Sequence, residues 1–173
     1  MIEILGARAA SAVADELREV YFSAFGAPGY DEPVEKANQF AAEQLPTHAT
    51  RPGFKLVVTR SGGAITGFAY GFTCDRGQWW PDRIAEVAPE LADEWVGGHF
   101  EFVELAVAAS AQRQGLGAKL HDALMTDLPH AKALLSTYAD DRPAPRLYRR
   151  KGWQLLLPNL TPSAALYGEH LAR

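Results

Sequence analysis

The sequence has only one cysteine, Cys74, so no internal disulfide can form within its 173 residues. Its first residues carry neither the basic segment nor the long apolar segment of a secretory signal. Its apolar runs stay far below the roughly 18 residues that a membrane-spanning helix needs. Because disulfides belong to oxidising compartments, these absences predict a cytoplasmic protein without a membrane partner.

An excess of basic residues is also missing, because 17 Lys and Arg stand against 21 Asp and Glu. The formal net charge of −4 argues against nucleic acid as the main partner. The motifs Gly-x-Ser-x-Gly, His-Glu-x-x-His and Cys-x-x-Cys do not occur, and the five histidines show no metal-ligand spacing. We therefore expect no metal, and we interpret Cys74 as a packed thiol rather than a nucleophile.

The composition is that of an ordinary globular protein, with 47% hydrophobic and 22% charged residues. No internal repeat, low-complexity tract or flexible linker divides the chain. A chain of 173 residues is long enough for one sizeable core, so residues 1–173 are expected to form a single domain.

The most informative segment joins an alternating strand to a glycine turn. Residues 101–107 read Glu-Phe-Val-Glu-Leu-Ala-Val, and residues 112–117 read Gln-Arg-Gln-Gly-Leu-Gly before an amphipathic helix. Gly115 and Gly117 lack side chains, so backbone N–H groups at this helix N-terminus can close around a bulky anion. The pattern predicts a cofactor that carries a diphosphate.

Two other glycine-rich phosphate sites fit this segment less well. A dinucleotide-binding turn requires a third glycine at position 120, where this chain has leucine, and it follows its strand more closely. A P-loop requires Gly-Lys-Ser/Thr, whereas Gly117 is followed by Ala-Lys-Leu.

The spacing Gln112-x-x-Gly115-x-Gly117 after Leu105-Ala106-Val107 resembles the acyl-CoA-binding signature of the GNAT superfamily of N-acetyltransferases. About thirty residues further on, residues 144–153 resemble that family's Ala-x-x-Leu-Tyr-x-x-x-Gly-Phe/Trp element. The resemblance is specific from about residue 99 to residue 153 and topological before that. It implies acetyl transfer from acetyl-CoA to an amine.

The resemblance also implies an α/β (α+β) GNAT-like fold, with a mixed sheet flanked by helices on both faces. Hydrophobic periodicity and turn residues agree with that order. Strands are predicted at 2–5, 55–60, 64–73, 99–108, 132–138, from 153, and at 165–171. Helices are predicted at 13–25, from 31 to a stop near Pro46, as two short segments within 79–96, at 115–127 and at 143–151.

The family resemblance assigns the coenzyme contacts residue by residue. The backbone of Leu105, Ala106 and Val107 would pair with the pantetheine amides like an added strand. Asp141 occupies the position of an asparagine that contacts the coenzyme in many members, and this departure weakens the expectation there. The residues expected to surround the pyrophosphate are Gln112, Arg113, Gln114, Gly115, Leu116, Gly117 and Ala118.

Acetyl transfer to an amine requires a base, because an amine with a pKa of about 10 is protonated at neutral pH. Glu101 and Glu104 are the candidates, and regular alternation would turn them to opposite faces of the strand. The resemblance favours Glu101 by position, and Glu104 stands where many members carry a glutamate. Tyr148 resembles the family's general acid. The alternatives are two solvated strand charges and a core aromatic ring.

The acceptor is predicted from an acidic stretch before the motif strand. Between residues 82 and 104, seven Asp and Glu stand against a single arginine. Trp79, Trp80 and Trp95 accompany them, and acidic groups beside indole faces suit a cationic small-molecule or peptide amine. A solvated acidic helix with packed tryptophans is the alternative. A non-catalytic acyl-CoA-binding domain, a transferase of a longer acyl group and a homodimer also remain open.

Overall fold

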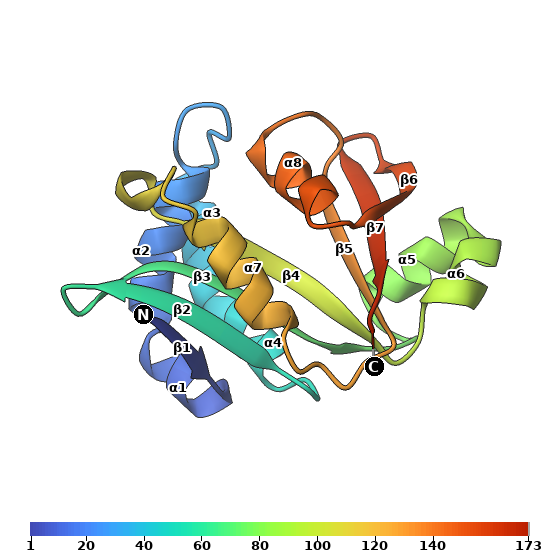
Figure 1. Cartoon of the computed structure of the whole chain (residues 1–173), viewed down its shortest axis with the longest axis horizontal. Coiled ribbons are helices and arrows are strands. Elements are labelled where there is room, and N and C mark those ends of the chain that lie inside the picture. The colour runs from blue at the N-terminus through green and yellow to red at the C-terminus, as the bar shows by residue number, and fades with distance from the viewer. Residues whose placement is uncertain (173) are drawn as a thin grey trace. The chain divides into compact units, whose positions relative to one another are not determined.

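The structure is a computed structural model that describes residues 1–172. Its strands are β1 (Ile2–Leu5), β2 (Lys55–Ser61), β3 (Ala64–Cys74), β4 (His99–Val107), β5 (Lys132–Tyr138), β6 (Gln154–Thr161) and β7 (Ala164–His170) (Figure 1). The helices are α1 (Ala7–Ala12), α2 (Ala14–Phe25), α3 (Val34–Gln39), α4 (Leu45–Ala49), α5 (Trp79–Val87), α6 (Pro89–Trp95), α7 (Leu116–Met125) and α8 (Pro143–Arg150). A π-helical turn covers Phe40–Gln44 and a 3₁₀ turn covers Ala109–Ala111.

The strands form a mixed sheet with the order β1-β2-β3-β4-β5-β7-β6, as the predicted α/β fold class requires. The chain packs into two compact units, and β4 contributes residues to both. The first unit contains Met1–Phe72 and Glu104–Asp127, and the second contains Thr73–Val103 and the chain from Leu128 onwards.

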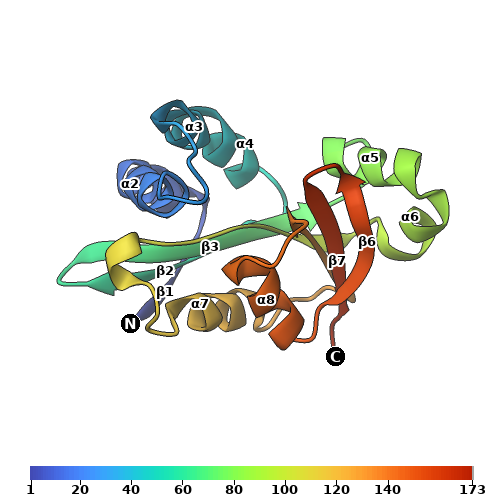
Figure 2. The same ribbon diagram turned by 90° about the horizontal axis from the view of Figure 1, so that it is seen from above.

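In the first unit, β1, β2 and β3 pair antiparallel, with Ile4 opposite Val57 and Val58 opposite Phe68. Helices α2, α3 and α4 lie on one side of these strands and α7 on the other, which buries the sheet on both faces (Figure 2). The core between the sheet and α2 is aromatic, because Phe40 stacks on Tyr21 at 4.7 Å and on Phe68 at 5.5 Å.

Gly67 on β3 allows α7 to lie close to the sheet. A Cβ at this position would stand 2.9 Å from Leu120 Cδ1 and 3.2 Å from the Ala106 carbonyl oxygen. Leu120 and Leu124 on α7 are fully buried, which is the helical spacing that the sequence predicts for this face.

The helix predicted to stop near Pro46 continues past that residue, and this prediction was wrong. In the π-helical turn before it, the Leu45 N–H bonds the Phe40 carbonyl. Pro46 therefore stands in the first turn of a new helical segment, α4, where its missing N–H costs little. Helix α1 was not predicted, because its alanine-rich sequence has no apolar period.

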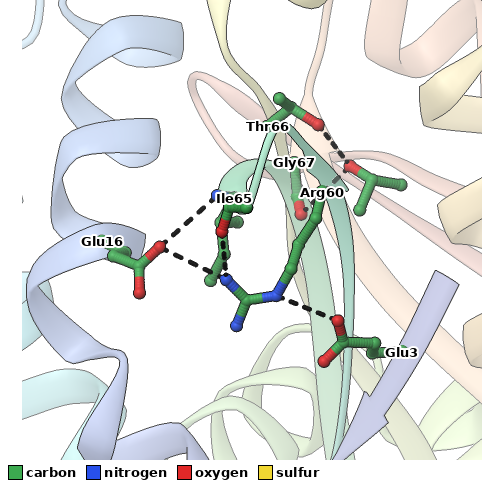
Figure 3. Close-up of polar contacts among 8 residues, drawn as sticks. Glu3, Glu16, Arg60, Ile65, Thr66 and Gly67 are labelled. Atoms are coloured by element: carbon green, nitrogen blue, oxygen red, sulfur yellow. Dashed lines mark hydrogen bonds and ion pairs between the residues drawn. The ribbon is translucent and has the colours of Figure 1, made fainter. Parts of the chain in front are cut away.

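A polar cluster lies at the turn of the β2–β3 hairpin (Figure 3). Arg60 Nε donates to Glu3 Oε1 at 3.0 Å, and its Nη1 lies 3.5 Å from Glu16 Oε2 on α2 and 2.8 Å from the Gly63 carbonyl oxygen. Such partly exposed ion pairs each stabilise a fold by at most about 1 kcal/mol, so the cluster mainly fixes the direction of the hairpin.

In the second unit, β4 pairs parallel to β5, with Phe100 opposite Ala133, and β5, β7 and β6 continue antiparallel. Helices α5 and α6 are two short segments that divide at Pro89, as predicted. One apolar core cluster of this unit contains Ile84, Ala92, Trp95, Leu134, Leu160 and Leu166. Within residues 1–172, no helix has the length and apolar character that crossing a membrane requires.

Candidate active site

The glycine turn forms the N-terminus of α7. Gly115 is the residue before the helix and has φ 76°, a left-handed conformation that glycine adopts without steric cost. No side chain caps the helix at Gly115, and the first turn contains no acidic residue. A Cβ on Gly115 would meet nothing within 4 Å among the described residues, so open space lies beside this turn. The turn therefore fits a phosphate group, which would accept hydrogen bonds from these N–H groups.

The end of β4 is fixed by three hydrogen bonds. The Ala108 N–H donates to the Thr66 carbonyl at 2.9 Å, and the Ala109 N–H donates to Ser23 Oγ at 2.9 Å. The Gln112 side-chain amide donates to the Val107 carbonyl at 3.0 Å. Gln112 therefore holds the loop through its side chain, whereas the following residues Arg113 to Gly115 are exposed.

The opposite end of α7 is tied to β2. Lys55 Nζ donates to three carbonyl oxygens at that end: Ala123 at 2.9 Å, Leu124 at 3.1 Å and Thr126 at 2.7 Å. A cation at a helix C-terminus satisfies unpaired carbonyls and opposes the negative end of the helix dipole. Burial lowers the pKa of Lys55, while the nearby Asp127 carboxylate opposes that shift.

Glu104 lies in the first unit, in a network that sequence reasoning did not find. Its Oε2 accepts a hydrogen bond from Gln44 Nε2 at 2.9 Å. The same nitrogen lies 3.0 Å from Tyr70 Oη, which is 2.9 Å from His48 Nδ1. These residues come from the π-helical turn, β3 and α4, so three separate elements build the surroundings of one carboxylate.

Burial raises the pKa of Glu104 to about 7. The negative charge of Glu32 acts in the same direction, while the Gln44 hydrogen bond and the positive charge of Lys36 lower the pKa. A carboxyl group with such a pKa is protonated in about half of the molecules at neutral pH and is able to exchange a proton there.

Glu101 lies in the second unit, 5% exposed, in a different cluster. Its Oε2 is 2.9 Å from His99 Nε2, and His99 Nδ1 accepts a hydrogen bond from the Gly97 N–H at 3.1 Å. With Nδ1 accepting, the imidazole carries its proton on Nε2 and donates it to Glu101. Burial raises the pKa of Glu101, and the hydrogen bond and charge of His99 oppose that shift.

Cys74 completes the Glu101 cluster. Ligand atoms of Cys74, His99 and Glu101 lie within 4.8 Å of one another, a donor set that a zinc ion accepts. Each of these groups nevertheless has a hydrogen-bond partner already, since the Cys74 thiol donates to Gln78 Oε1 at 2.8 Å. The expected absence of a metal therefore stays a prediction, although the residues that could bind one lie closer together than their sequence spacing indicated.

Tyr148 lies on α8 in the second unit and is 6% exposed. Its ring packs edge-on against Phe102, with centroids 5.6 Å apart, and against Trp153 at 6.1 Å. Its backbone carbonyl accepts a hydrogen bond from the Trp153 N–H at 3.1 Å. The Leu-Tyr-x-x-x-Gly-Trp element is therefore a packing unit whatever chemistry its hydroxyl performs.

Asp141 is exposed and forms an ion pair with Arg149, the residue after Tyr148 on α8. Hydrogen bonds to Tyr167 and Asp141 raise the pKa of Arg149. The carboxylate thus has a basic partner within its own unit, which disfavours the direct coenzyme contact that an asparagine would make at this position.

The three tryptophans predicted at the acceptor site differ in exposure. Trp79 is 67% exposed, and its ring lies edge-on against Trp80 at 4.5 Å. Trp95 is 2% exposed and belongs to the apolar core, where a Cβ on Gly168 would stand 2.7 Å from its ring. Trp95 is therefore a core residue, and a role for it at the acceptor site stays a prediction.

The sequence matches the Acetyltransferase (GNAT) family over residues 12–153, which is most of its length. The chain belongs to this family. This is a family of acetyltransferases, and a non-catalytic acyl-CoA-binding domain stays the alternative.

A curated relative of this GNAT protein is an acetyltransferase. A GCN5-like protein acetyltransferase of Mycobacterium tuberculosis is 34% identical over 102 residues, or 54% of this chain and 50% of the relative. This chain therefore spans about half the length of the curated relative that it matches.

Solved structures of acetyltransferases share the fold over the whole chain. Aminoglycoside 6′-acetyltransferase type Ii has a TM-score of 0.67 and 14% identity, and the match covers 100% of this chain and 99% of that one. A GNAT acetyltransferase from Brucella melitensis, in complex with acetyl-CoA, has a TM-score of 0.61 and 16% identity, with 100% and 90% covered.

Proposed function

We propose that this GNAT enzyme, as one domain over residues 1–173, acetylates a positively charged primary amine of a small molecule or peptide. Glu104 acts as the general base and Tyr148 as the general acid. The observation that carries the proposal is the half-buried Glu104 carboxyl group, whose pKa of about 7 matches the task of taking a proton at neutral pH.

The reaction is a direct attack in which every proton has a destination. Glu104 accepts a proton from the ammonium group, directly or through water, and leaves a nucleophilic amine. The amine nitrogen forms a bond to the acetyl carbon while the carbon–sulfur bond breaks, and Tyr148 donates its phenolic proton to the departing coenzyme thiolate. The nitrogen loses its second proton as the amide forms, and this proton restores the Tyr148 phenol through water. Acetyl-CoA supplies the activated acetyl thioester.

Glu101 stays a second candidate for the base, because the family resemblance favours its position. Two observations favour Glu104 instead. The carboxylate of Glu101 is already hydrogen-bonded to the buried His99 ring. Its 5% exposure also leaves little access for an incoming amine, whereas Glu104 is half-buried.

The coenzyme would bind through backbone groups rather than charged side chains. Leu105, Ala106 and Val107 would face the pantetheine amides, and the residues from Gln112 to Ala118 would surround the pyrophosphate. The support for this arrangement is the uncapped N-terminus of α7 together with the open space beside Gly115.

The acceptor is inferred from the surface of α5 and α6. Their acidic residues Asp82, Glu86, Glu90, Asp93 and Glu94 are all exposed, and Trp79 is exposed at the start of α5. Two arginines offset part of this charge, because Arg83 pairs with Glu86 and Arg76 with Asp93. A surface of this kind attracts cations over distances near the Debye length, about 8–10 Å at physiological salt.

The experiment is a thiol-release assay with acetyl-CoA and four groups of acceptors: polyamines, aminoglycosides, lysine peptides, and neutral or acidic amines. Cationic acceptors should give the highest kcat/KM, and their rates should fall as NaCl rises from 20 to 500 mM. A preference for neutral or acidic amines without a salt effect would refute the acceptor class. Propionyl-CoA and longer thioesters in the same assay test whether a longer acyl group is preferred.

Two further features of the protein remain predictions. A homodimer through the last strands is tested by sedimentation velocity, and the cytoplasmic location by fractionation of cells that produce the protein.

A further inference from the structure

Gln44 is the residue that joins Glu104 to the interior of the first unit. It ends the π-helical turn, and its side chain is half-buried. Its amide nitrogen contacts both Glu104 Oε2 and Tyr70 Oη. We propose that Gln44 is the positioning residue of the base: its amide fixes the orientation of the Glu104 carboxylate and stabilises the ionised form. This inference rests on the proposed function of Glu104.

The direction of each hydrogen bond in the network follows from chemistry. An ionised carboxylate only accepts hydrogen bonds, so Gln44 must present its NH₂ group to Glu104. The second hydrogen of that group goes to Tyr70 Oη, which leaves the tyrosine O–H to donate to His48 Nδ1. The network has one consistent arrangement, in which Gln44 cannot rotate its amide without losing two bonds.

His48 and Tyr70 keep this arrangement near neutral pH. Burial and the positive charge of Arg51 lower the pKa of His48 to about 4, so its ring is neutral and Nδ1 remains an acceptor. Burial raises the pKa of Tyr70, so its hydroxyl keeps its proton and remains a donor. Neither His48 nor Tyr70 therefore changes its protonation state between pH 5 and pH 9.

Tyr70 is a rigid anchor because its ring is fully buried in an aromatic cluster. It lies 6.3 Å from the Phe40 ring, 5.7 Å from Phe54 and 5.7 Å from His48, measured between centroids. Gln44 is thus held at one end by a fixed hydroxyl and offers its other hydrogen to the carboxylate. Holding a functional group through such a supporting contact keeps its geometry productive.

The groups around Glu104 predict how its pKa changes when the hydrogen bond from Gln44 is removed. Burial and Glu32 raise the pKa, whereas Gln44 and Lys36 lower it. With the Gln44 bond removed, only Lys36 opposes burial, so the pKa of Glu104 must rise. The base is then protonated over a wider range of pH.

The test replaces Gln44 with methionine, an unbranched side chain of similar length without an N–H group. Because a hydrogen bond to a charged group is lost, the acidic limb of kcat/KM should move upward by about one pH unit. Activity at pH 7 should fall about fivefold and approach the wild-type value above pH 9, with an unchanged KM for acetyl-CoA. A loss that is equal at every pH would instead assign Gln44 a structural role and overturn the inference.

A matched control uses Gln39, which is exposed on α3 and contacts Glu43 at 3.5 Å. Gln39→Met should leave the profile unchanged. Tyr70→Phe keeps the Glu104–Gln44 bond but removes its anchor, so the limb should move upward by less than the Gln44→Met shift. If Gln44→Met does not fold, Tyr70→Phe becomes the test of the inference. An acidic limb at the same pH as in the wild type would then overturn the inference.

Direct titration separates this inference from the proposed function. Infrared difference spectra between wild type and Glu104→Gln report the carboxyl pKa of Glu104 without an activity assay. If Glu104→Gln leaves the acidic limb intact, the proposed base is wrong. If Glu104→Gln removes the limb while Gln44→Met leaves both the limb and the infrared pKa in place, the positioning role alone is wrong.

Discussion

Glu101 and Glu104 stand three positions apart on β4, yet their surroundings differ in kind. Burial raises the pKa of both carboxyl groups. Glu101 is hydrogen-bonded to the buried His99 ring, whose other nitrogen accepts the Gly97 N–H, whereas Glu104 is hydrogen-bonded to the Gln44 amide. An amide leaves the proton equilibrium to the carboxylate alone.

A raised pKa therefore does not assign a role to either residue, and the chemistry of the partner separates them. The Glu101 cluster is closed, with each polar group satisfied inside it. In the Glu104 network, Gln44 is hydrogen-bonded to Tyr70, and Tyr70 is hydrogen-bonded to His48. Four measurements test this contrast.

The largest effect is expected from Glu104→Gln, which keeps the shape of the side chain and removes the base. Activity at pH 7 should fall about 1,000-fold, and the acidic limb of the pH–rate profile near pH 7 should disappear. The sign follows from the mechanism, because the base acts when ionised and activity rises with pH through its pKa. Glu101→Gln is the matched control and should change kcat/KM by less than about fivefold. The reverse pattern would make Glu101 the base.

Tyr148→Phe should lower turnover about 100-fold while acetyl-CoA affinity is nearly kept, since the substitution removes one hydroxyl and little packing. The acidic limb should stay where it is, because Glu104 is unaltered. Rapid-mixing kinetics and calorimetric titration measure the two quantities. Full turnover would remove Tyr148 from the mechanism, and an equal loss of stability and activity would make it a packing residue.

Gly115→Val should weaken acetyl-CoA binding at least about tenfold. A β-branched residue is strained at φ 76°, and its side chain would enter the open space beside the first turn of α7. Calorimetric titration measures the affinity, and circular dichroism checks that the fold is retained. Glu101→Gln and Glu104→Gln should bind acetyl-CoA normally, and Gly115→Val with normal affinity would refute the phosphate site.

The smallest effect concerns stability. The folded state holds a proton on Glu104 up to about pH 7, whereas the unfolded chain releases it near the ordinary pKa of 4.5. The wild-type protein should therefore lose stability as the pH rises from 4.5 to 7. Glu104→Gln avoids this cost, and its free energy of unfolding at pH 8 should exceed the wild-type value by about 1–3 kcal/mol. Urea titration at pH 5 and pH 8 measures it. An equal difference at both pH values would contradict the linkage.

Local patterns predicted the strands and the glycine turn, because their signals lie within a few residues. The run from Lys132 to Tyr138 is a strand with the predicted bounds, and the glycine turn precedes a helix, as predicted. The division of the acidic stretch at Pro89 also follows from one residue, since a proline in a helix interior lacks the N–H and clashes with the preceding turn.

The two glutamate clusters could not be predicted, because their members are distant in the chain. Gln44 and Glu104 are 60 positions apart, and no periodic pattern links a π-helical turn to a strand. Cys74 and His99 are separated by α5 and α6. The burial of Trp95 could not be predicted either, since an indole beside acidic residues suits both a cation site and a core.

The two ends of helix α7 differ in how they are held. This difference determines how much conformational entropy is lost when the coenzyme binds. Lys55 already holds the last turn, while the first turn keeps its N–H groups without a side-chain cap at Gly115. A ligand phosphate would thus order only the first turn and the loop before it, and little freedom remains to be lost elsewhere in the helix. In amide hydrogen exchange, added acetyl-CoA should slow exchange at residues 115–118 and leave residues 122–125 as they were.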